Sequence, residues 1–187
     1  DIQNVLENAI ASFSKDKTLE WAMFTIMDAK TGAIVASASN PNFNPNTLEG
    51  LDNYLNPLVS YQYEPGSTMK IFSWLAAMEN GIYNGSDMFE SGTITLSDGG
   101  TVIKDFNNVG WGSINYDTGF AYSSNVAATN LALKLGSAKL NDYYDLCGFG
   151  EKTGITLPGE AEGQVDITYE SELANASFGQ GILVTPV

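Results

Sequence analysis

A serine and a lysine three residues apart are the side chains best suited to chemistry in this sequence, in the segment Ser67-Thr68-Met69-Lys70. In a helix, residues at this spacing lie on one face with Cβ atoms about 5–6 Å apart. Burial lowers the pKa of a lysine, so a buried Lys70 has a populated neutral amine that can take the Ser67 proton. The positive end of the helix would also favour an oxyanion. The pair predicts acyl transfer through a serine nucleophile.

The sequence contains no histidine, so any nucleophilic chemistry needs a different base, and lysine is the main remaining choice. This absence excludes the Ser–His–Asp triad, the Cys–His pair and every histidine-based metal site. Other Ser-x-x-Lys matches, Ser12 with Lys15 and Ser14 with Lys17, lie near the end of a predicted surface helix, where a lysine stays solvated and charged. The context therefore selects the match at residues 67–70.

A second group of polar residues, Ser123-Ser124-Asn125, precedes another apolar helical pattern. A serine at this position can also act simply as the N-cap of that helix. The segment Ser113-Ile114-Asn115 has a similar Ser-x-Asn pattern, but we expect it in a glycine-rich loop with no helix behind it.

The elements that position these groups follow from the hydrophobic periodicity. Residues 2–13 predict an amphipathic helix, residues 21–28 and 33–39 predict two strands joined by a hairpin at 29–32, and 40–66 predict a long surface loop. Apolar residues cover nearly every face of 67–80, so we expect a helix buried on all sides. A hairpin at 92–105 turns at Ser97-Asp98-Gly99-Gly100. Helices are predicted at 124–135, ended by Gly136, and at 137–147, ended by Gly148, with 149–187 irregular.

Composition limits the partners. The chain has 187 residues, 43% of them apolar, which suits one globular domain. Its formal net charge of −14 disfavours nucleic acid and direct binding to a membrane surface. The single cysteine, Cys147, cannot form an internal disulfide, so the redox compartment stays open. Neither a transmembrane segment nor a signal peptide is indicated, so we expect any export or anchoring segment to lie outside this chain.

Several segments together resemble the transpeptidase domain of class B penicillin-binding proteins. Residues 64–70 resemble the nucleophile segment, 122–126 the second motif, and 150–160 a segment typical of that class. Phe178-Gly179-Gln180-Gly181 and Thr185-Pro186 resemble the stretch before the last catalytic elements. Spacing and order agree over nearly the whole chain. The Ser-x-x-Lys, Ser-x-Asn and Lys-Thr-Gly motifs are the set shared by these proteins and serine β-lactamases.

The resemblance implies a role for each of four site residues. Ser67 would be the acylated nucleophile, with its backbone N–H as one oxyanion donor, and Lys70 the base that activates it. Ser123 would relay protons to the leaving amine. Asn125 would orient Lys70 and the substrate backbone, and Ser67, Ser123 and Asn125 would bind the substrate.

The resemblance also implies an α/β (α+β) fold with a helical subdomain and a partial antiparallel sheet. The chain is then a single partial transpeptidase domain over 1–187, with a helix and hairpin at 1–39, the nucleophile helix at 67–80 and the second-motif helix at 123–136. The expected activity is D,D-transpeptidation of peptidoglycan stem peptides ending in D-Ala–D-Ala, with β-lactams trapping Ser67. No metal or organic cofactor is expected, and the location would be outside the cytoplasmic membrane, on an anchor absent here.

The third motif departs from the family pattern. Lys30-Thr31-Gly32 lies in the predicted hairpin turn, and Lys152-Thr153-Gly154 leads into a loop. The catalytic copy must lie on a strand beside the nucleophile, where its backbone can pair with an extended peptide. We therefore expect this strand and most of the sheet to lie beyond Val187. The chain by itself would then be impaired in catalysis and poorly stable, and the unpaired hairpin edge would invite self-association.

The same residues are also compatible with other functions. A serine β-lactamase or D,D-carboxypeptidase would use the same nucleophile but transfer the acyl group to water. A β-lactam sensor would be acylated without turning over peptide, and a non-catalytic scaffold would recruit division proteins. An acidic α/β domain whose motif matches are accidental is the remaining possibility.

Overall fold

The computed structural model describes residues 1–49, 53–97 and 99–187, which form two compact units. The first unit comprises residues 1–61, 155–161 and 186–187, and the second comprises 62–154 and 162–185. The fold is mixed α+β with small antiparallel sheets, as predicted. Asp98 of the predicted turn and residues 50–52 of the predicted loop lie outside the described residues.

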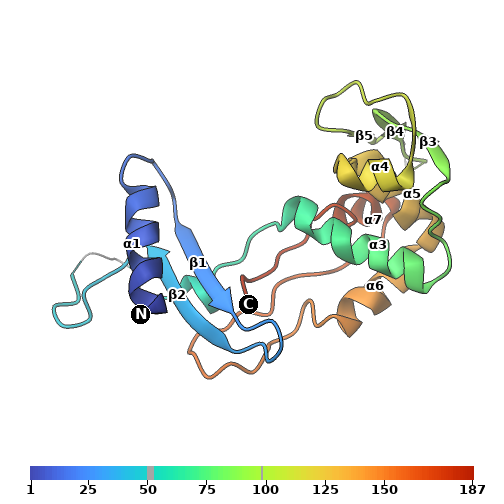
Figure 1. Ribbon diagram of the computed structural model, residues 1–187. Coiled ribbons are helices and arrows are strands. Elements are labelled where there is room, and N and C mark those ends of the chain that lie inside the picture. The colour runs from blue at the N-terminus through green and yellow to red at the C-terminus, as the bar shows by residue number, and fades with distance from the viewer. Residues whose placement is uncertain (50–52, 98) are drawn as a thin grey trace. The chain divides into compact units, whose positions relative to one another are not determined.

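The first unit is built on a helix packed against a hairpin (Figure 1). The helix α1 spans Ile2–Ser14, and the antiparallel strands β1 and β2 span Ala22–Met27 and Ile34–Asn40. Leu6 and Ile10 of α1 are buried against Ala36 and Ala38 of β2. This contact explains why the 3.6-residue apolar period and the two-residue strand period occur together in the first forty residues.

The described part of the segment after the hairpin includes an element that the sequence did not indicate. A short helix, α2, spans Pro57–Ser60, with the side chain of Asn56 accepting a hydrogen bond from the Leu58 N–H. The Ser60 hydroxyl donates to the carbonyl of Gly159 at 2.7 Å, which ties α2 to the 155–161 loop. The prediction of a continuous surface loop over 40–66 is therefore wrong at α2, where proline at the first helical position supplies a preset φ.

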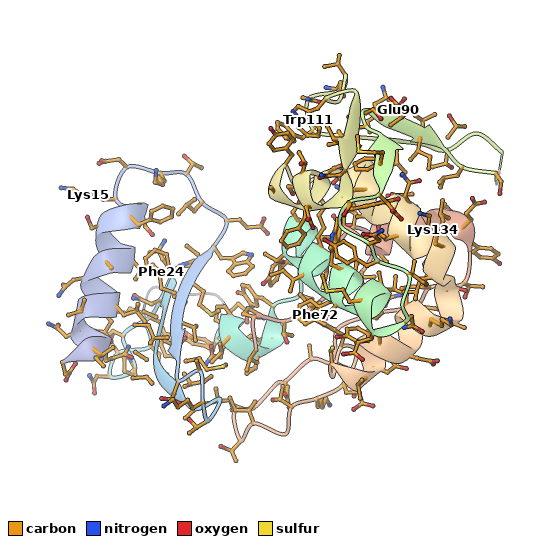
Figure 2. The ribbon with its side chains drawn as sticks, turned by 45° about the vertical axis from the view of Figure 1, so that its right-hand side comes forward. Lys15, Phe24, Phe72, Glu90, Trp111 and Lys134 are labelled. Atoms are coloured by element: carbon orange, nitrogen blue, oxygen red, sulfur yellow. The ribbon has the colours of Figure 1, made fainter. Side chains whose placement is uncertain are left out.

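The second unit is mainly helical (Figure 1). Helices α3 (Lys70–Glu79), α5 (Asn125–Leu135), α6 (Ser137–Leu146) and α7 (Glu170–Ala176) pack on one another around two buried apolar clusters. Phe72 of α3, labelled in Figure 2, meets Phe149 edge-on at 4.8 Å between ring centroids. The largest fully buried side chains are Tyr144, Met69, Leu131, Leu140 and Ile182.

Two small two-stranded sheets and a short helix also belong to this unit. Strand β3 (Met88–Glu90) pairs with β6 (Ser113–Asn115), and β4 (Thr93–Thr95) pairs with β5 (Val102–Lys104). Helix α4 spans Tyr116–Ala121, and its N-cap Asn115 accepts from the Thr118 N–H at 2.8 Å. The expectation that residues 113–115 lie in a loop with no helix behind them is therefore wrong.

Two further helix predictions need correction. Residues 149–187 were expected to be irregular, but α7 lies within them, with Glu172 accepting from the N-cap N–H of Tyr169 at 2.9 Å. Helix α3 is not buried on all sides, since Ile71, Leu75 and Met78 are 50%, 40% and 47% exposed. An apolar pattern around a helix shows that each face suits burial, whereas tertiary packing decides which faces are covered.

No helix among the described residues combines the length and apolarity that crossing a membrane requires. The same part of the chain contains no group of three acidic, cysteine or histidine side chains placed to hold a metal ion.

Candidate active site

The site begins at a single turn of 3₁₀-helix, η1, which spans Gly66–Met69 and runs directly into α3. A 3₁₀ turn has three residues, so side chains at i and i+3 eclipse each other. Ser67 and Lys70 are such a pair, and the Lys70 Nζ lies 3.2 Å from the Ser67 Oγ. The predicted helix from residue 67 thus starts in a tighter conformation, which brings these two groups into line.

The chain before Ser67 is fixed by the segment at 177–185. Tyr63 and Val184 exchange two backbone hydrogen bonds of 3.0 Å, and the Gly66 N–H donates to the Gly179 carbonyl at 2.9 Å. The Glu64 carboxylate accepts from the Gly181 N–H at 2.8 Å. Gly179 has φ +78°, and a Cβ there would collide with the Gly66 backbone. The glycines at 179 and 181 are therefore part of what holds the nucleophile segment in place.

The Ser123-Ser124-Asn125 segment is the junction of two helices. Ser123 follows α4 with φ +56°, a left-handed conformation that is usually left to glycine at this position after a helix. Its N–H donates to Phe120, and the Ser124 N–H donates to Gly119, at 2.9 and 2.8 Å. Ser124 then caps α5 by accepting from the Ala127 N–H at 3.0 Å. The N-cap interpretation thus holds for Ser124, while Ser123 and Asn125 are turned toward Lys70.

Lys70 is only 2% exposed, and its amine lies among four oxygens. These are the Ser123 carbonyl at 2.5 Å, Asn125 Oδ1 at 2.7 Å, Ser123 Oγ at 3.0 Å and Ser67 Oγ at 3.2 Å. The Asn125 amide orientation is fixed because its Nδ2 donates to the Lys104 carbonyl at 2.9 Å. All four residues selected from the sequence are therefore brought together.

The hydrogen-bond directions define what this amine can do. The Ser123 carbonyl and Asn125 Oδ1 can only accept, so each takes one N–H of the amine. A neutral amine has two N–H groups and one lone pair, and the lone pair then faces the Ser67 and Ser123 hydroxyls. Burial lowers the pKa of Lys70 to about 8, against an opposing effect of the Asp105 carboxylate. A neutral Lys70 can thus accept a proton from either hydroxyl.

One buried acid beside this cluster was not predicted from the sequence. Asp105 follows β5 and is 1% exposed, and its carboxylate accepts from the Ser124 hydroxyl, the Val126 N–H and the Gly92 N–H. In the sequence, Asp105 comes directly after a predicted strand. An aspartate at such a position is also common in exposed turns, so its position alone did not indicate a role in the site. Its burial depends on contacts across the sequence, so the pattern around it could not show its role.

The other motif matches lie elsewhere. Lys30-Thr31-Gly32 forms the turn between β1 and β2, where Asp28 Oδ1 accepts from the Thr31 N–H at 2.8 Å. Lys152 lies in a loop and forms an exposed ion pair with Glu162 at 3.5 Å. Lys15 lies just beyond the end of α1 (Figure 2), where its side chain is exposed. Neither Lys-Thr-Gly segment lies on a strand, as predicted.

The chain belongs to the penicillin binding protein transpeptidase domain family, which matches residues 22–187. It is 33% identical to the peptidoglycan D,D-transpeptidase FtsI of Escherichia coli K12 over 187 residues, covering 97% of this chain and 30% of the relative. It is 32% identical to the stage V sporulation protein D of Bacillus subtilis, covering 100% of this chain and 29% of the relative.

Solved structures agree with this assignment. Penicillin-binding protein 2X from Streptococcus thermophilus superposes with a TM-score of 0.88 at 35% identity, covering 100% of this chain and 28% of the other. Penicillin-binding protein 3 from Mycobacterium tuberculosis, complexed with aztreonam, superposes with a TM-score of 0.86 at 31% identity, covering 99% and 42%. The resemblance inferred from the motifs is confirmed, and the chain spans about 30% of the length of the curated relatives named above.

Proposed function

We propose that this chain carries the acylation site of a serine D,D-transpeptidase that cross-links peptidoglycan stem peptides. The proposal rests on the geometry around the Lys70 amine. Its two N–H groups donate to the Ser123 carbonyl and to Asn125 Oδ1, so its lone pair faces the Ser67 and Ser123 hydroxyls. The substrate class is inferred from relatives that are named peptidoglycan D,D-transpeptidases.

Each site residue has a role in this reaction. Lys70 takes the Ser67 proton as the Ser67 Oγ bonds to the carbonyl carbon of the D-Ala–D-Ala peptide bond. The C–N bond then breaks, and the proton passes from Lys70 through the Ser123 hydroxyl to the departing D-alanine amine. Asn125 keeps the amine oriented and binds the substrate backbone, and the Ser67 N–H stabilises the oxyanion. An amine of a neighbouring peptide finally attacks the ester carbonyl, the bond to the Ser67 Oγ breaks, and the proton that the amine loses returns to the Ser67 Oγ through Ser123 and Lys70.

The cell-wall substrate places the reaction outside the cytoplasmic membrane, and we propose that an anchor outside residues 1–187 holds the protein there. β-Lactams are the expected covalent inhibitors, because their strained amide would acylate Ser67 by the same steps. The chemistry assigned to Ser67, Lys70, Ser123 and Asn125 uses no cofactor.

The test is intact-protein mass spectrometry after incubation with benzylpenicillin. We expect one adduct with the mass of the antibiotic, lost in Ser67→Ala and retained in Ser12→Ala, which removes the serine of the exposed Ser-x-x-Lys match. An adduct that survives Ser67→Ala would reject the assignment of the nucleophile. The absence of an adduct on the full-length protein that contains this chain would reject the function itself.

A second measurement separates the transpeptidase from its alternatives. The protein is incubated with a D-Ala–D-Ala peptide and a D-amino acid acceptor, and the products are resolved by mass. Exchange of the terminal residue supports transpeptidation, whereas release of the shortened peptide alone indicates a carboxypeptidase. Acylation by penicillin without either product indicates a β-lactam sensor, and rapid hydrolysis of a chromogenic β-lactam indicates a β-lactamase.

A further inference from the structure

A buried carboxylate outside the four motif residues organises the site. Asp105 Oδ1 accepts from the Ser124 hydroxyl at 2.8 Å and from the Val126 N–H at 3.1 Å, while Oδ2 accepts from the Gly92 N–H at 2.8 Å. Ser124 and Val126 are the chain neighbours of Ser123 and Asn125. One side chain therefore holds the Ser124 hydroxyl and the Val126 N–H, on either side of Asn125, and ties them to Gly92 at the start of the β4–β5 hairpin.

The three donors explain why the residue is an acid. Both oxygens of a carboxylate accept hydrogen bonds, whereas a carboxamide has one accepting oxygen and one donating nitrogen. The single oxygen of an asparagine at position 105 could accept from Ser124 and Val126, but its NH₂ group would then face the Gly92 N–H, which is also a donor. A buried negative charge is also favourable here, because Val126 belongs to the first turn of α5, where the helix dipole is positive.

The neighbouring residue extends the same anchor. The Lys104 carbonyl accepts from Asn125 Nδ2 at 2.9 Å, which turns Asn125 Oδ1 toward the Lys70 amine. The Asp105 N–H donates to the Gly92 carbonyl at 2.9 Å, and this fixes the end of β5. Displacing Asp105 would thus disturb Asn125 by two routes, through Val126 and through Lys104.

We propose, on the basis of the proposed function, that Asp105 is a positioning residue for acyl transfer. It fixes the left-handed Ser123 and the side chain of Asn125 around the Lys70 amine. It touches neither the nucleophile nor the amine, so its effect passes through Ser124, Val126 and the charge that it places in the buried site.

The charge gives the proposal a readout that a purely structural role would not produce. The Asp105 carboxylate favours the ammonium form of Lys70 and so opposes the lowering of the Lys70 pKa by burial. The other groups around the amine, from η1 and the α4–α5 junction, are the uncharged Ser67, Ser123 and Asn125. On the adjoining segments of chain, the ionisable side chains are Glu64, which binds the Gly181 N–H, and Lys104, which is exposed. Removing the Asp105 charge should therefore lower the Lys70 pKa.

The experiment compares Asp105→Asn with Asp117→Asn in the intact protein. Asp117 lies in the first turn of α4, is exposed and accepts a hydrogen bond from Tyr83, so its substitution removes the same charge away from Lys70. Benzylpenicillin acylation rates are measured from pH 5 to 10. For Asp105→Asn we expect a plateau about tenfold to a hundredfold lower, from misplacement of Asn125 and Ser123. The acidic limb should move to lower pH, and Asp117→Asn should match the unmodified protein.

A second variant covers the case in which Asp105→Asn does not fold. Ser124→Ala removes the hydrogen bond to Asp105 and the cap on the Ala127 N–H, but keeps the carboxylate and its bond to the Val126 N–H. Its plateau should fall while its acidic limb stays in place, since the charge remains. Acylation of Ser124→Ala at the rate of the unmodified protein would overturn the positioning role. An unmoved limb in a folded Asp105→Asn protein would overturn the effect of the charge.

A measurement without any reaction separates this proposal from the proposed function. The ¹³Cε shift of Lys70, assigned by its loss in Lys70→Arg, is titrated in the unmodified protein and in Asp105→Asn. A lower midpoint in the variant supports the effect of Asp105 even if penicillin does not acylate the protein. An identical midpoint contradicts that effect even if acylation proceeds normally.

Discussion

The Lys70 amine lies 2.5 Å from the main-chain oxygen of Ser123, a residue held in the left-handed region at φ +56°. A non-glycine residue in this region costs about 1–2 kcal/mol. The strained turn points both the carbonyl and the hydroxyl of Ser123 at one amine. Strain of this kind persists where the surrounding contacts determine it, and here the Schellman-type bonds of α4 and the cap of α5 do so.

The first prediction concerns the pH dependence of acylation. With a pKa of about 8, roughly a tenth of the Lys70 amines are neutral at pH 7. The folded-state pKa is depressed, so the reactive neutral form grows as pH rises. The benzylpenicillin acylation rate should rise about tenfold per pH unit below this pKa and level off above it. A rate that keeps rising beyond pH 10 would mean that Lys70 has the pKa of an ordinary lysine.

The second prediction tests Lys70 as the base. Lys70→Arg keeps a positive charge, but a guanidinium stays protonated and cannot accept the Ser67 proton. The acylation rate should fall by about 10²–10⁴-fold. The matched control is Lys15→Arg, which alters the exposed lysine of the other Ser-x-x-Lys match and should leave the rate unchanged. Equal rates for the two variants would exclude Lys70 from proton transfer.

The third prediction separates the hydroxyl of Ser123 from its backbone. Ser123→Ala and Ser123→Gly both remove the hydroxyl, so both should acylate more slowly. Glycine adopts a positive φ without strain, so Ser123→Gly should be more stable than Ser123→Ala by about 1 kcal/mol. Thermal unfolding should show a difference of about 2–4 °C in Tm. The opposite order of stability would show that φ at this position is not strained.

The fourth prediction concerns Asn125, whose Oδ1 lies 2.7 Å from the Lys70 Nζ. Asn125→Asp puts a carboxylate there, which favours the ammonium and raises the pKa of Lys70. The acidic limb of the acylation profile should move to higher pH. Asn130→Asp adds the same charge elsewhere on α5 and should not move it. A limb that moves equally in both variants would indicate a general effect of net charge.

Much of the site was accessible from the sequence because its groups lie in local patterns. The spacing of Ser67 and Lys70, and the position of Ser123-Ser124-Asn125 before an apolar helix, are visible within a few residues of chain. Both Lys-Thr-Gly segments could also be set aside from local context, since one lies in a hairpin turn and the other in a loop.

What could not be predicted depends on contacts across the sequence. Asp105 is buried because Gly92, Ser124 and Val126 converge on it, and no local period reports that convergence. Helix α4 was missed because its six residues are too short for a clear amphipathic period. The exposed face of α3 was predicted to be buried because composition alone does not identify which faces find partners.

The fifth prediction uses the close approach of Gly179 to Gly66. Gly179→Ala adds a Cβ against the Gly66 backbone and also strains φ +78°. Gly148→Ala strains a similar φ of +84° but meets no atom within 4 Å, so it isolates the conformational cost. We expect Gly148→Ala to cost about 1 kcal/mol and Gly179→Ala about 3 kcal/mol or more. Gly179→Ala should also slow acylation, because Gly66 precedes the nucleophile. If the two variants lose the same free energy of unfolding, the segments that contain Gly66 and Gly179 can move apart without cost.

In the first unit, the Gln3 side chain covers the edge of strand β2 at Ser37. The Gln3 side chain accepts from the Ser37 N–H at 3.2 Å and donates to the Ser37 carbonyl at 2.9 Å, as a neighbouring strand would. Uncovered strand edges promote association between chains. Gln3→Leu should therefore lower the free energy of unfolding by about 1 kcal/mol and increase self-association in sedimentation experiments. Asn4→Leu adds similar apolar surface on α1 without exposing that edge. If Asn4→Leu associates as strongly as Gln3→Leu, apolar surface alone explains the association, and the edge of β2 is not its cause.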